Sequence, residues 1–263
     1  MAQLSLSTMW STRRPSVVAF HREARELGFT HLELSGVVTP EALPEFLGPE
    51  ALPVLSIHAP CPNGPTELGR PAGALSLAAL DEDERREAVR RALDTIDLAS
   101  RVGARCVVLH AGWTDLNPEM ERELRRLVQA GAADGPDYAD LKCRMTAARE
   151  FFACPHIDAV KESLLELAAR ARARGVKLAL ENRVHFHEIP SFDEMMDILS
   201  EFPPEVLGYW HDVGHAEIQA RVGFTPHEDW LVTFGERLLG VHLHDVRGLS
   251  DHLPPGTGEI DWA

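Results

Sequence analysis

The feature that most constrains the fold is a repeated alternation of short apolar strands with amphipathic helices. Seven apolar runs recur along the chain, and helical patterns with apolar residues at three- and four-residue spacing separate most of them. The strand candidates are QLSLSTM from 3, HLELS from 31, VLSIHAP from 54, CVVLHAG from 106, KLALEN from 177, LGYWHDV from 207 and GVHLHDV from 240. Such strands predict a parallel sheet covered by helices, in either a barrel or a doubly wound sheet.

Helix boundary signals support this alternation. Asp81 with Glu84, and Ser191 with Glu194, have the spacing of a capping box at a helix start. Three glycines follow helical patterns where a helix commonly ends in a left-handed residue: Gly28, Gly103 and Gly175. The predicted helices therefore begin and end between the predicted strands.

A long connection interrupts the alternation after the fourth strand. From Trp113 to about Pro155, the segments NPEMERELRRLVQAG and DYADLKCRMTAAREFFA predict one or two additional helices. Insertions at the carboxyl ends of strands commonly form a lid or a pocket wall. Since no linker or change of composition divides the chain, we expect residues 1–263 to form a single domain with an insertion at about 113–155.

Charge and composition favour a small-molecule substrate over nucleic acid. The chain has 41 acidic and 26 basic residues, and its formal net charge of -15 repels nucleic acid and anionic membrane surfaces. No apolar run approaches the roughly 20 residues of a membrane span, the amino terminus lacks a leader pattern, and the cysteines form no CxxC pair. We therefore expect a cytoplasmic protein without a membrane partner, and a homo-oligomer remains compatible with the sequence.

Metal-binding residue types collect at the carboxyl ends of the predicted strands. The set comprises His58 and His110 on the third and fourth strands, Glu181 on the fifth, Asp212 and His215 on the sixth, and His242 in the seventh. In a parallel barrel these ends converge on one mouth, whereas a doubly wound sheet would spread them along an edge. A barrel is therefore favoured, with a divalent cation such as zinc, manganese or magnesium at its mouth.

Two interpretations of these residues remain open on this evidence. A single histidine at a strand end is more often a structural group than a metal ligand. The combination favours metal, because Glu181 and Asp212 at neighbouring strand ends would repel each other and lose hydration. A cation between them would remove both costs.

Six motifs carry a resemblance to a known family. In chain order they are IHAP, VLHAG, ALENR, HDVGHA, VHLHD and DHLPPGTGEIDW, and together they resemble the xylose-isomerase-like TIM-barrel superfamily across essentially the whole chain. That superfamily contains sugar-phosphate isomerases and epimerases and the type-IV apurinic endonucleases. The resemblance implies an α/β fold of the (β/α)8 TIM-barrel kind.

The epimerase branch implies one metal ion held by a glutamate, an aspartate, a histidine and a glutamate on strands five to eight. Glu181, Asp212 and His242 match the first three positions. The eighth strand and its glutamate are missing from the sequence, because EIDWA resembles only the opening of the preceding helix. We therefore expect the chain to be a fragment; a seven-stranded barrel, or a closing strand from another chain, are the alternatives.

The endonuclease branch implies three metal ions and a wider ligand set. It adds histidines on strands three and four, a second histidine on strand six, and an Asp-x-His after strand seven. The matching residues are His58, His110, His215 and His252. Ser250 stands where that motif has its aspartate, and the negative charge of the chain also argues against a DNA substrate.

The resemblance implies a function in sugar metabolism. We expect a metal-dependent isomerase or epimerase of a sugar, sugar phosphate or related polyol, in which the metal stabilises an enediolate. Glu181 is the candidate base, His215 would orient the substrate or hold a second metal, and Arg247, like Arg183, would bind substrate oxygens. The alternatives are a metal-dependent phosphoester hydrolase of the endonuclease kind and a non-catalytic barrel that binds a small ligand.

Several polar residues beside these motifs are interpreted as structural. VHFHEIP places His185, His187 and Glu188 in the loop after the fifth strand, where we interpret them as solvated. His244 is expected to lie on the other side of its strand from His242.

Overall fold

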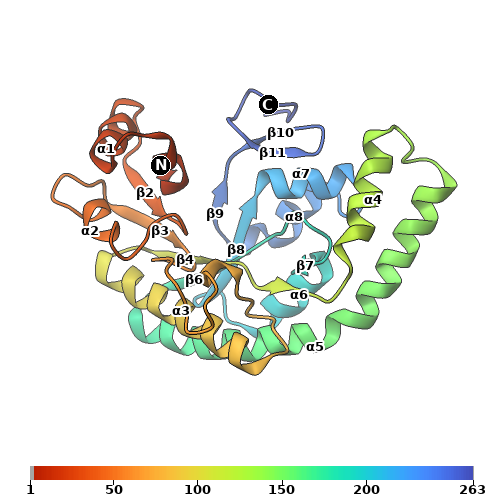
Figure 1. Ribbon diagram of the computed structural model, residues 1–263, viewed down its shortest axis with the longest axis horizontal. Coiled ribbons are helices and arrows are strands. Elements are labelled where there is room, and N and C mark those ends of the chain that lie inside the picture. The colour runs from red at the N-terminus through yellow and green to blue at the C-terminus, as the bar shows by residue number, and fades with distance from the viewer. Residues whose placement is uncertain (1–2, 263) are drawn as a thin grey trace. The chain divides into compact units, whose positions relative to one another are not determined.

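The strands predicted from the sequence form a seven-stranded sheet. In a computed structural model that describes residues 3–262, the strand order is β1-β2-β3-β4-β6-β8-β9 (Figure 1). The strands are β1 (Ser5–Ser7), β2 (His31–Leu34), β3 (Val54–His58), β4 (Cys106–Leu109), β6 (Lys177–Glu181), β8 (Leu207–Asp212) and β9 (Leu238–His242). The pairs β1–β2, β2–β3, β3–β4 and β8–β9 are parallel. The seven strand predictions are confirmed.

Helices separate these strands, and their ends carry the predicted signals. They are α1 (Val17–Glu26), α2 (Leu43–Phe46), α3 (Glu82–Val102), α4 (Pro118–Gln129), α5 (Pro136–Arg174), α6 (Phe192–Glu201), α7 (Val213–Arg221) and α8 (His227–Phe234), with the 3-10 helices η1 (Thr8–Arg13), η2 (Ala72–Ala74) and η3 (Gly235–Arg237). Asp81 caps α3, Ser191 and Glu194 form the capping box of α6, and Gly103 ends α3 at a φ of 74°. Among residues 3–262, no helix is both long and apolar enough to cross a membrane.

The chain divides into two compact units, the first of which contains Met1–Leu77, Asp81–Leu109 and Ser163–Ala179. All four residues of β4 are buried, as expected for a parallel strand covered on both faces. The core of this unit draws on its helices and strands alike, with fully buried side chains at Phe20, Leu32, Leu34, Ile57, Ile96 and Val107.

The second unit contains Ala78–Leu80, His110–Glu162 and Leu180–Ala263. Besides β8 and β9, it has an antiparallel pair of β5 (Gly112–Trp113) with β7 (Glu188–Ile189) and one of β10 (Asp245–Arg247) with β11 (Ser250–Leu253). The β10–β11 ribbon lies beside α7 (Figure 1). This unit therefore holds most of the residues that the sequence nominated as functional.

The inserted segment forms α4 and the first part of α5. Its second predicted helix continues without a break through Pro155 to Arg174, so α5 is 39 residues long. Proline removes one backbone hydrogen bond and leaves the carbonyl four residues earlier without its donor. Phe151 occupies that earlier position and is 78% exposed, so the proline interrupts the hydrogen bonds on the solvent-facing side of the helix.

A single buried carboxylate organises the segment after β11. Asp245 accepts hydrogen bonds from the backbone N–H groups of Gly256, Gly258 and Ile260 at 2.8, 2.9 and 3.1 Å, and from the indole of Trp262 at 3.2 Å. Burial raises the pKa of Asp245, but these donors outweigh it and hold the pKa well below its usual range. Residues 256–262 are not helical, contrary to the expected helix opening, because their N–H groups turn toward this carboxylate.

We predict that Asp245→Ala makes the backbone of residues 256–262 more mobile. Without the carboxylate, the N–H groups of residues 256, 258 and 260 lose their common acceptor, so amide hydrogen exchange there should accelerate by at least roughly tenfold. Asp134→Ala, which removes an exposed carboxylate in the α4–α5 turn, is the control and should leave exchange unchanged. Equal protection in Asp245→Ala and the unmodified protein would contradict this account.

Candidate metal centre

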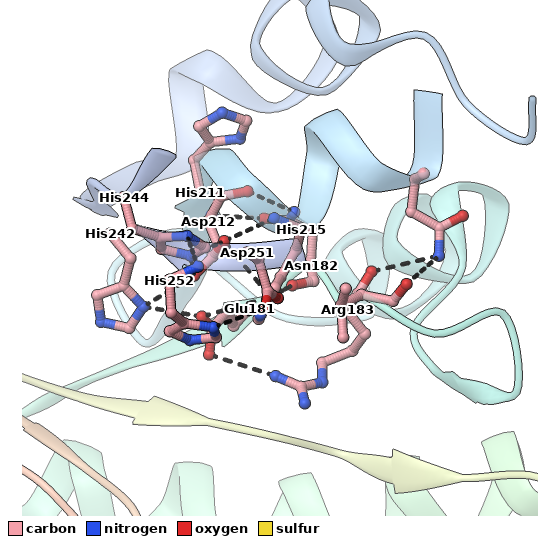
Figure 2. A network of polar contacts seen from close by, with 12 residues as sticks. Glu181, Asn182, Arg183, His211, Asp212, His215, His242, His244, Asp251 and His252 are labelled. Atoms are coloured by element: carbon pink, nitrogen blue, oxygen red, sulfur yellow. Dashed lines mark hydrogen bonds and ion pairs between the residues drawn. The ribbon is translucent and has the colours of Figure 1, made fainter. Parts of the chain in front are cut away.

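Three of the predicted ligands meet at the carboxyl ends of strands in the second unit. Glu181, Asp212 and His242 are the last residues of β6, β8 and β9. Asp212 and His242 are direct partners in the parallel β8–β9 register, so their side chains leave the sheet at the same level. One ligand atom from each of the three residues lies within 4.8 Å of the others, and Figure 2 shows the side chains gathered together.

The two carboxylates of this trio are buried and ionised. The side chains of Glu181 and Asp212 are only 1% and 2% exposed. Burial opposes ionisation of Glu181, but the imidazoles of His242 and His110 hold the pKa of its carboxyl well below the usual range. Burial likewise opposes ionisation of Asp212, whose pKa is lowered by His215, His242 and His244. Both residues therefore present anionic oxygens, the form that binds a cation.

The buried charges around the trio favour a divalent cation. Glu188, with a side chain 14% exposed, and Arg183, 9% exposed, lie beside Glu181 and form an ion pair of 2.7 Å. Three carboxylates and one guanidinium sum to a formal charge of minus two, before any proton on the imidazoles is counted. Two uncompensated negative charges are costly at low dielectric, and a divalent cation would balance them. The donor set of carboxylate oxygen and imidazole nitrogen suits such an ion.

His215 is oriented with one ring nitrogen available. Its Nδ1 lies 2.9 Å from the carbonyl oxygen of Asn182, so Nδ1 carries the proton and Nε2 keeps its lone pair. Its backbone N–H donates to Oδ1 of Asp212 at 2.8 Å, which makes Asp212 the N-cap of α7. Burial lowers the pKa of His215, which disfavours a second proton on the ring. The structure therefore places His215 beside the trio.

His244 reaches the centre, contrary to the sequence expectation. The expectation was wrong for two reasons. Residues two apart on a strand lie on the same face, and β9 ends at His242, so strand alternation does not apply to His244. Its Nδ1 accepts from the backbone N–H of His252 at 3.0 Å, which leaves the proton on Nε2, 2.8 Å from Oδ1 of Asp212. His244 thus orients Asp212. The one sequence feature related to this position is Gly214: any larger residue there would place a Cβ 2.0 Å from the His244 ring, so only glycine leaves room for it.

His252 stacks on His244. The two rings are 4.3 Å apart and nearly parallel, and His252 adopts a left-handed φ of 58°. Asp251 hydrogen-bonds to His252 and raises the pKa of its imidazole. Nitrogens of His215, His244 and His252 lie within 4.8 Å of one another, but both nitrogens of His244 already have partners. A second metal would therefore depend on His215 and His252, whose role as ligands stays a prediction.

His110 and Arg183 also contact the carboxylate of Glu181. Nε2 of His110 lies 2.7 Å from Oε2 of Glu181, while His242 binds the other oxygen at 2.8 Å. The guanidinium of Arg183 contacts the same Nε2 of His110 and lies 3.7 Å from Oε2 of Glu181. These contacts are drawn in part in Figure 2, where Arg183 approaches from the loop after β6. Each oxygen of Glu181 is thus held in a defined position.

The family is shown by a match over most of the chain. The chain matches the family described as xylose isomerase-like TIM barrel over residues 22–263. It belongs to this family. The fold expectation from the sequence is therefore confirmed.

One relative and two solved structures illustrate what this chain is similar to. An uncharacterised protein, y4fM, of Sinorhizobium fredii (strain NBRC 101917 / NGR234) is 24% identical over 256 residues, which is 90% of this chain and 72% of y4fM. The structure of 3-keto-D-glucoside 4-epimerase, YcjR, from E. coli has a TM-score of 0.64 at 16% identity, and covers 99% of this chain and 84% of its own. The IolI protein with a bound zinc atom has a TM-score of 0.62 at 17% identity, over 99% and 81%. These solved structures establish likeness of fold.

The two remaining residues nominated from the xylose isomerase-like pattern are His58 and Arg247. His58 ends β3 in the first unit, where its Nδ1 is 3.1 Å from the carbonyl oxygen of Ala59. Arg247, in β10, is exposed and donates to the carbonyl oxygen of Thr257. The metal-binding role of His58 and the substrate-binding role of Arg247 stay predictions.

The interpretation of the loop after β6 as solvated is wrong for Glu188 and His187, whose side chains are 14% and 20% exposed, whereas His185 is 43% exposed. Glu188 is buried against Arg183, while Nδ1 of His185 and of His187 lie 3.0 and 3.3 Å from the carboxylate of Glu121 on α4. The partner comes from the inserted segment, about 65 residues earlier in the chain, and no local pattern could indicate it.

We predict that Glu188→Gln destabilises this family member in a pH-dependent way. Burial raises the pKa of Glu188, but Arg183 lowers it to about 2, so the ionised group stabilises the fold above its unfolded pKa near 4.5. The substitution should lower the free energy of unfolding at neutral pH by about 3 kcal/mol, and the loss should shrink as pH falls from 4.5 toward 2. Urea unfolding at several pH values measures it, with exposed Glu150→Gln as control. A loss independent of pH would contradict the ion-pair account.

Proposed function

We propose that this protein is a metal-dependent isomerase or epimerase acting on a sugar, sugar phosphate or related polyol. The observation that carries the proposal is the convergence of Glu181, Asp212 and His242, whose ligand atoms lie within 4.8 Å of one another. Two ionised carboxylates and an imidazole form an oxygen and nitrogen donor set suited to zinc, manganese or magnesium. A divalent cation held there would supply Lewis-acid stabilisation of negative charge on substrate oxygens.

The trio and its neighbours include a candidate base for the proton transfer of such a reaction and residues that would orient that base and the substrate. Glu181 is the proposed base for the proton α to the substrate carbonyl, because a carboxylate at the end of β6 beside the proposed metal ligands can reach a substrate carbon. His110, 2.7 Å from Oε2 of Glu181, holds that oxygen in place. His215 would orient the substrate through Nε2, because its Nδ1 is occupied by the carbonyl of Asn182.

The comparisons support the same class of reaction. YcjR is a 3-keto-D-glucoside 4-epimerase, and the IolI structure contains a bound zinc atom. Both share the fold over 99% of this chain. An epimerase and a zinc-binding protein with this fold are consistent with the donor set described above.

One observation favours a second candidate function, a metal-dependent phosphoester hydrolase. His215 and His252 belong to a second group of imidazoles beside the trio, which would allow more than one metal ion. His244, the third member, is occupied by Asp212 and the backbone of His252, so the single-metal isomerase remains the main proposal.

We predict one divalent ion per chain after metal loading. After gel filtration, elemental analysis should find one equivalent of metal per chain of the unmodified protein. It should find none for Asp212→Asn, because that variant loses a negative charge from the buried donors. Two or three equivalents would favour the hydrolase. No bound metal in any loading condition would refute both enzyme proposals and leave a ligand-binding barrel.

We predict that Glu181→Gln lowers isomerase activity by about 10²- to 10⁴-fold, the usual contribution of a general base. The measurement is exchange of the substrate α proton with D2O, followed by NMR over a panel of ketoses and inososes. Glu259→Gln, which alters an ion pair of a half-exposed side chain, is the control and should retain full exchange. Normal exchange by Glu181→Gln with its metal still bound would exclude Glu181 as the base.

A further inference from the structure

The loop after β6 is held by side chains of the inserted segment. Residues 183–190 connect the end of β6 to α6 and carry Arg183 and Glu188, the ion pair beside the metal centre. Polar side chains of α4 and α5 bind several backbone groups of this loop. The insertion therefore acts on the position of residues that touch Glu181.

Glu121 on α4 is the centre of this attachment. Glu121 is 2% exposed, and its Oε2 accepts a hydrogen bond from the backbone N–H of Phe186 at 2.8 Å. Nδ1 of His185 lies 3.0 Å from Oε1, Nδ1 of His187 lies 3.3 Å from Oε2, and Arg125 donates to Oε1 at 2.8 Å. Burial raises the pKa of Glu121, but these partners lower it below the usual range, so the carboxylate is ionised.

Two arginines of the insertion complete the attachment. Arg125 donates to the carbonyl oxygen of Val184 at 2.8 Å, and Arg149 donates to the carbonyl oxygen of Glu188 at 2.8 Å and to that of Phe186. Charged groups that bind backbone atoms at such distances fix a loop more strongly than neutral hydrogen bonds do. The backbone from 184 to 188 is thus bound from both inserted helices.

The bound loop determines where Arg183 lies. Glu188 accepts from Arg183 at 2.7 Å and from the backbone N–H of His185 at 2.9 Å, so its carboxylate is fixed by the loop. Arg183 in turn contacts His110 and lies 3.7 Å from Oε2 of Glu181. A continuous set of contacts therefore leads from α4 to the proposed base.

Glu121, His185 and His187 could also be regarded as a metal site, since their ligand atoms lie within 4.8 Å of one another. Arg125 argues against this, because its guanidinium lies 2.7 Å from Oε1 of Glu121 and 3.2 Å from Nδ1 of His185. A positive charge already neutralises this carboxylate, and a cation would be repelled. An anchoring role fits the charges better than a ligand role.

We propose that Glu121 is a positioning residue for the metal centre, which holds the 183–188 loop so that Arg183 stays against His110 and Glu181. This inference rests on the isomerase or epimerase function proposed above. Loss of the Glu121 carboxylate frees the N–H of Phe186 and both imidazoles, and Arg183 loses its fixed orientation. The fall in activity then appears in kcat, because the metal and its ligands remain.

The test compares Glu121→Gln with Glu123→Gln, a half-exposed glutamate on the same helix. In Glu121→Gln, amide exchange in residues 184–188 should rise and kcat should fall, each on the order of tenfold, as is usual for groups that orient the residues of a metal site. KM should change little, and bound metal should stay at the unmodified value. Glu123→Gln should match the unmodified protein. Arg125→Met, which removes the bond to Val184, repeats the test if Glu121→Gln does not fold.

A double-mutant cycle separates positioning from general destabilisation. In an Arg183→Lys background, Glu121→Gln should lower kcat no further, because its effect acts through Arg183. Fully additive losses, unchanged exchange in residues 184–188, or a loss of bound metal in Glu121→Gln would each overturn the proposal. If the unmodified protein isomerises no sugar tested, the proposed function fails, while the exchange and metal measurements still decide whether Glu121 anchors the loop.

Discussion

The centre depends on burying two negative charges next to each other. Glu181 and Asp212 are almost inaccessible to water, and each must find partners because an unpaired buried carboxylate is very costly. Imidazoles at neighbouring strand ends and the backbone N–H of His215 provide these partners. Since Arg183 compensates only part of the buried charge, the same requirement that shapes the site also favours a divalent cation there.

Asp212 links this requirement to the fold. It is at once the last residue of β8, the N-cap of α7 and a member of the proposed ligand trio. The side-chain amide of Asn182 binds both its backbone N–H, at 2.7 Å, and its carbonyl oxygen, at 2.9 Å. Tyr209 donates to the same amide oxygen at 3.0 Å. The carboxylate therefore sits on a rigid support from two adjacent strands, which limits how far the site can relax.

The sequence predicted what depends on local pattern. Apolar runs and helix caps located the seven strands, and the last residues of parallel strands necessarily share an edge, so Glu181, Asp212 and His242 could be predicted to meet. It did not predict contacts between distant segments. Nothing near Glu121 in the chain indicates His185 and His187, and only the bare backbone of Gly214 hints that His244 packs there, since both contacts arise from tertiary packing.

A histidine-rich segment can therefore contain several different roles. Among the histidines from 242 to 252, His242 lies in the proposed ligand trio and His244 donates to Asp212. His252 stacks on His244, and its backbone N–H donates to Nδ1 of His244. The distinction comes from which ring nitrogen is already occupied, because an imidazole whose two nitrogens both have partners has no lone pair to offer. In this family member, the contacts around Asp212 thus show that an imidazole can serve to orient a carboxylate, so the number of histidines in a segment does not equal the number of candidate metal ligands.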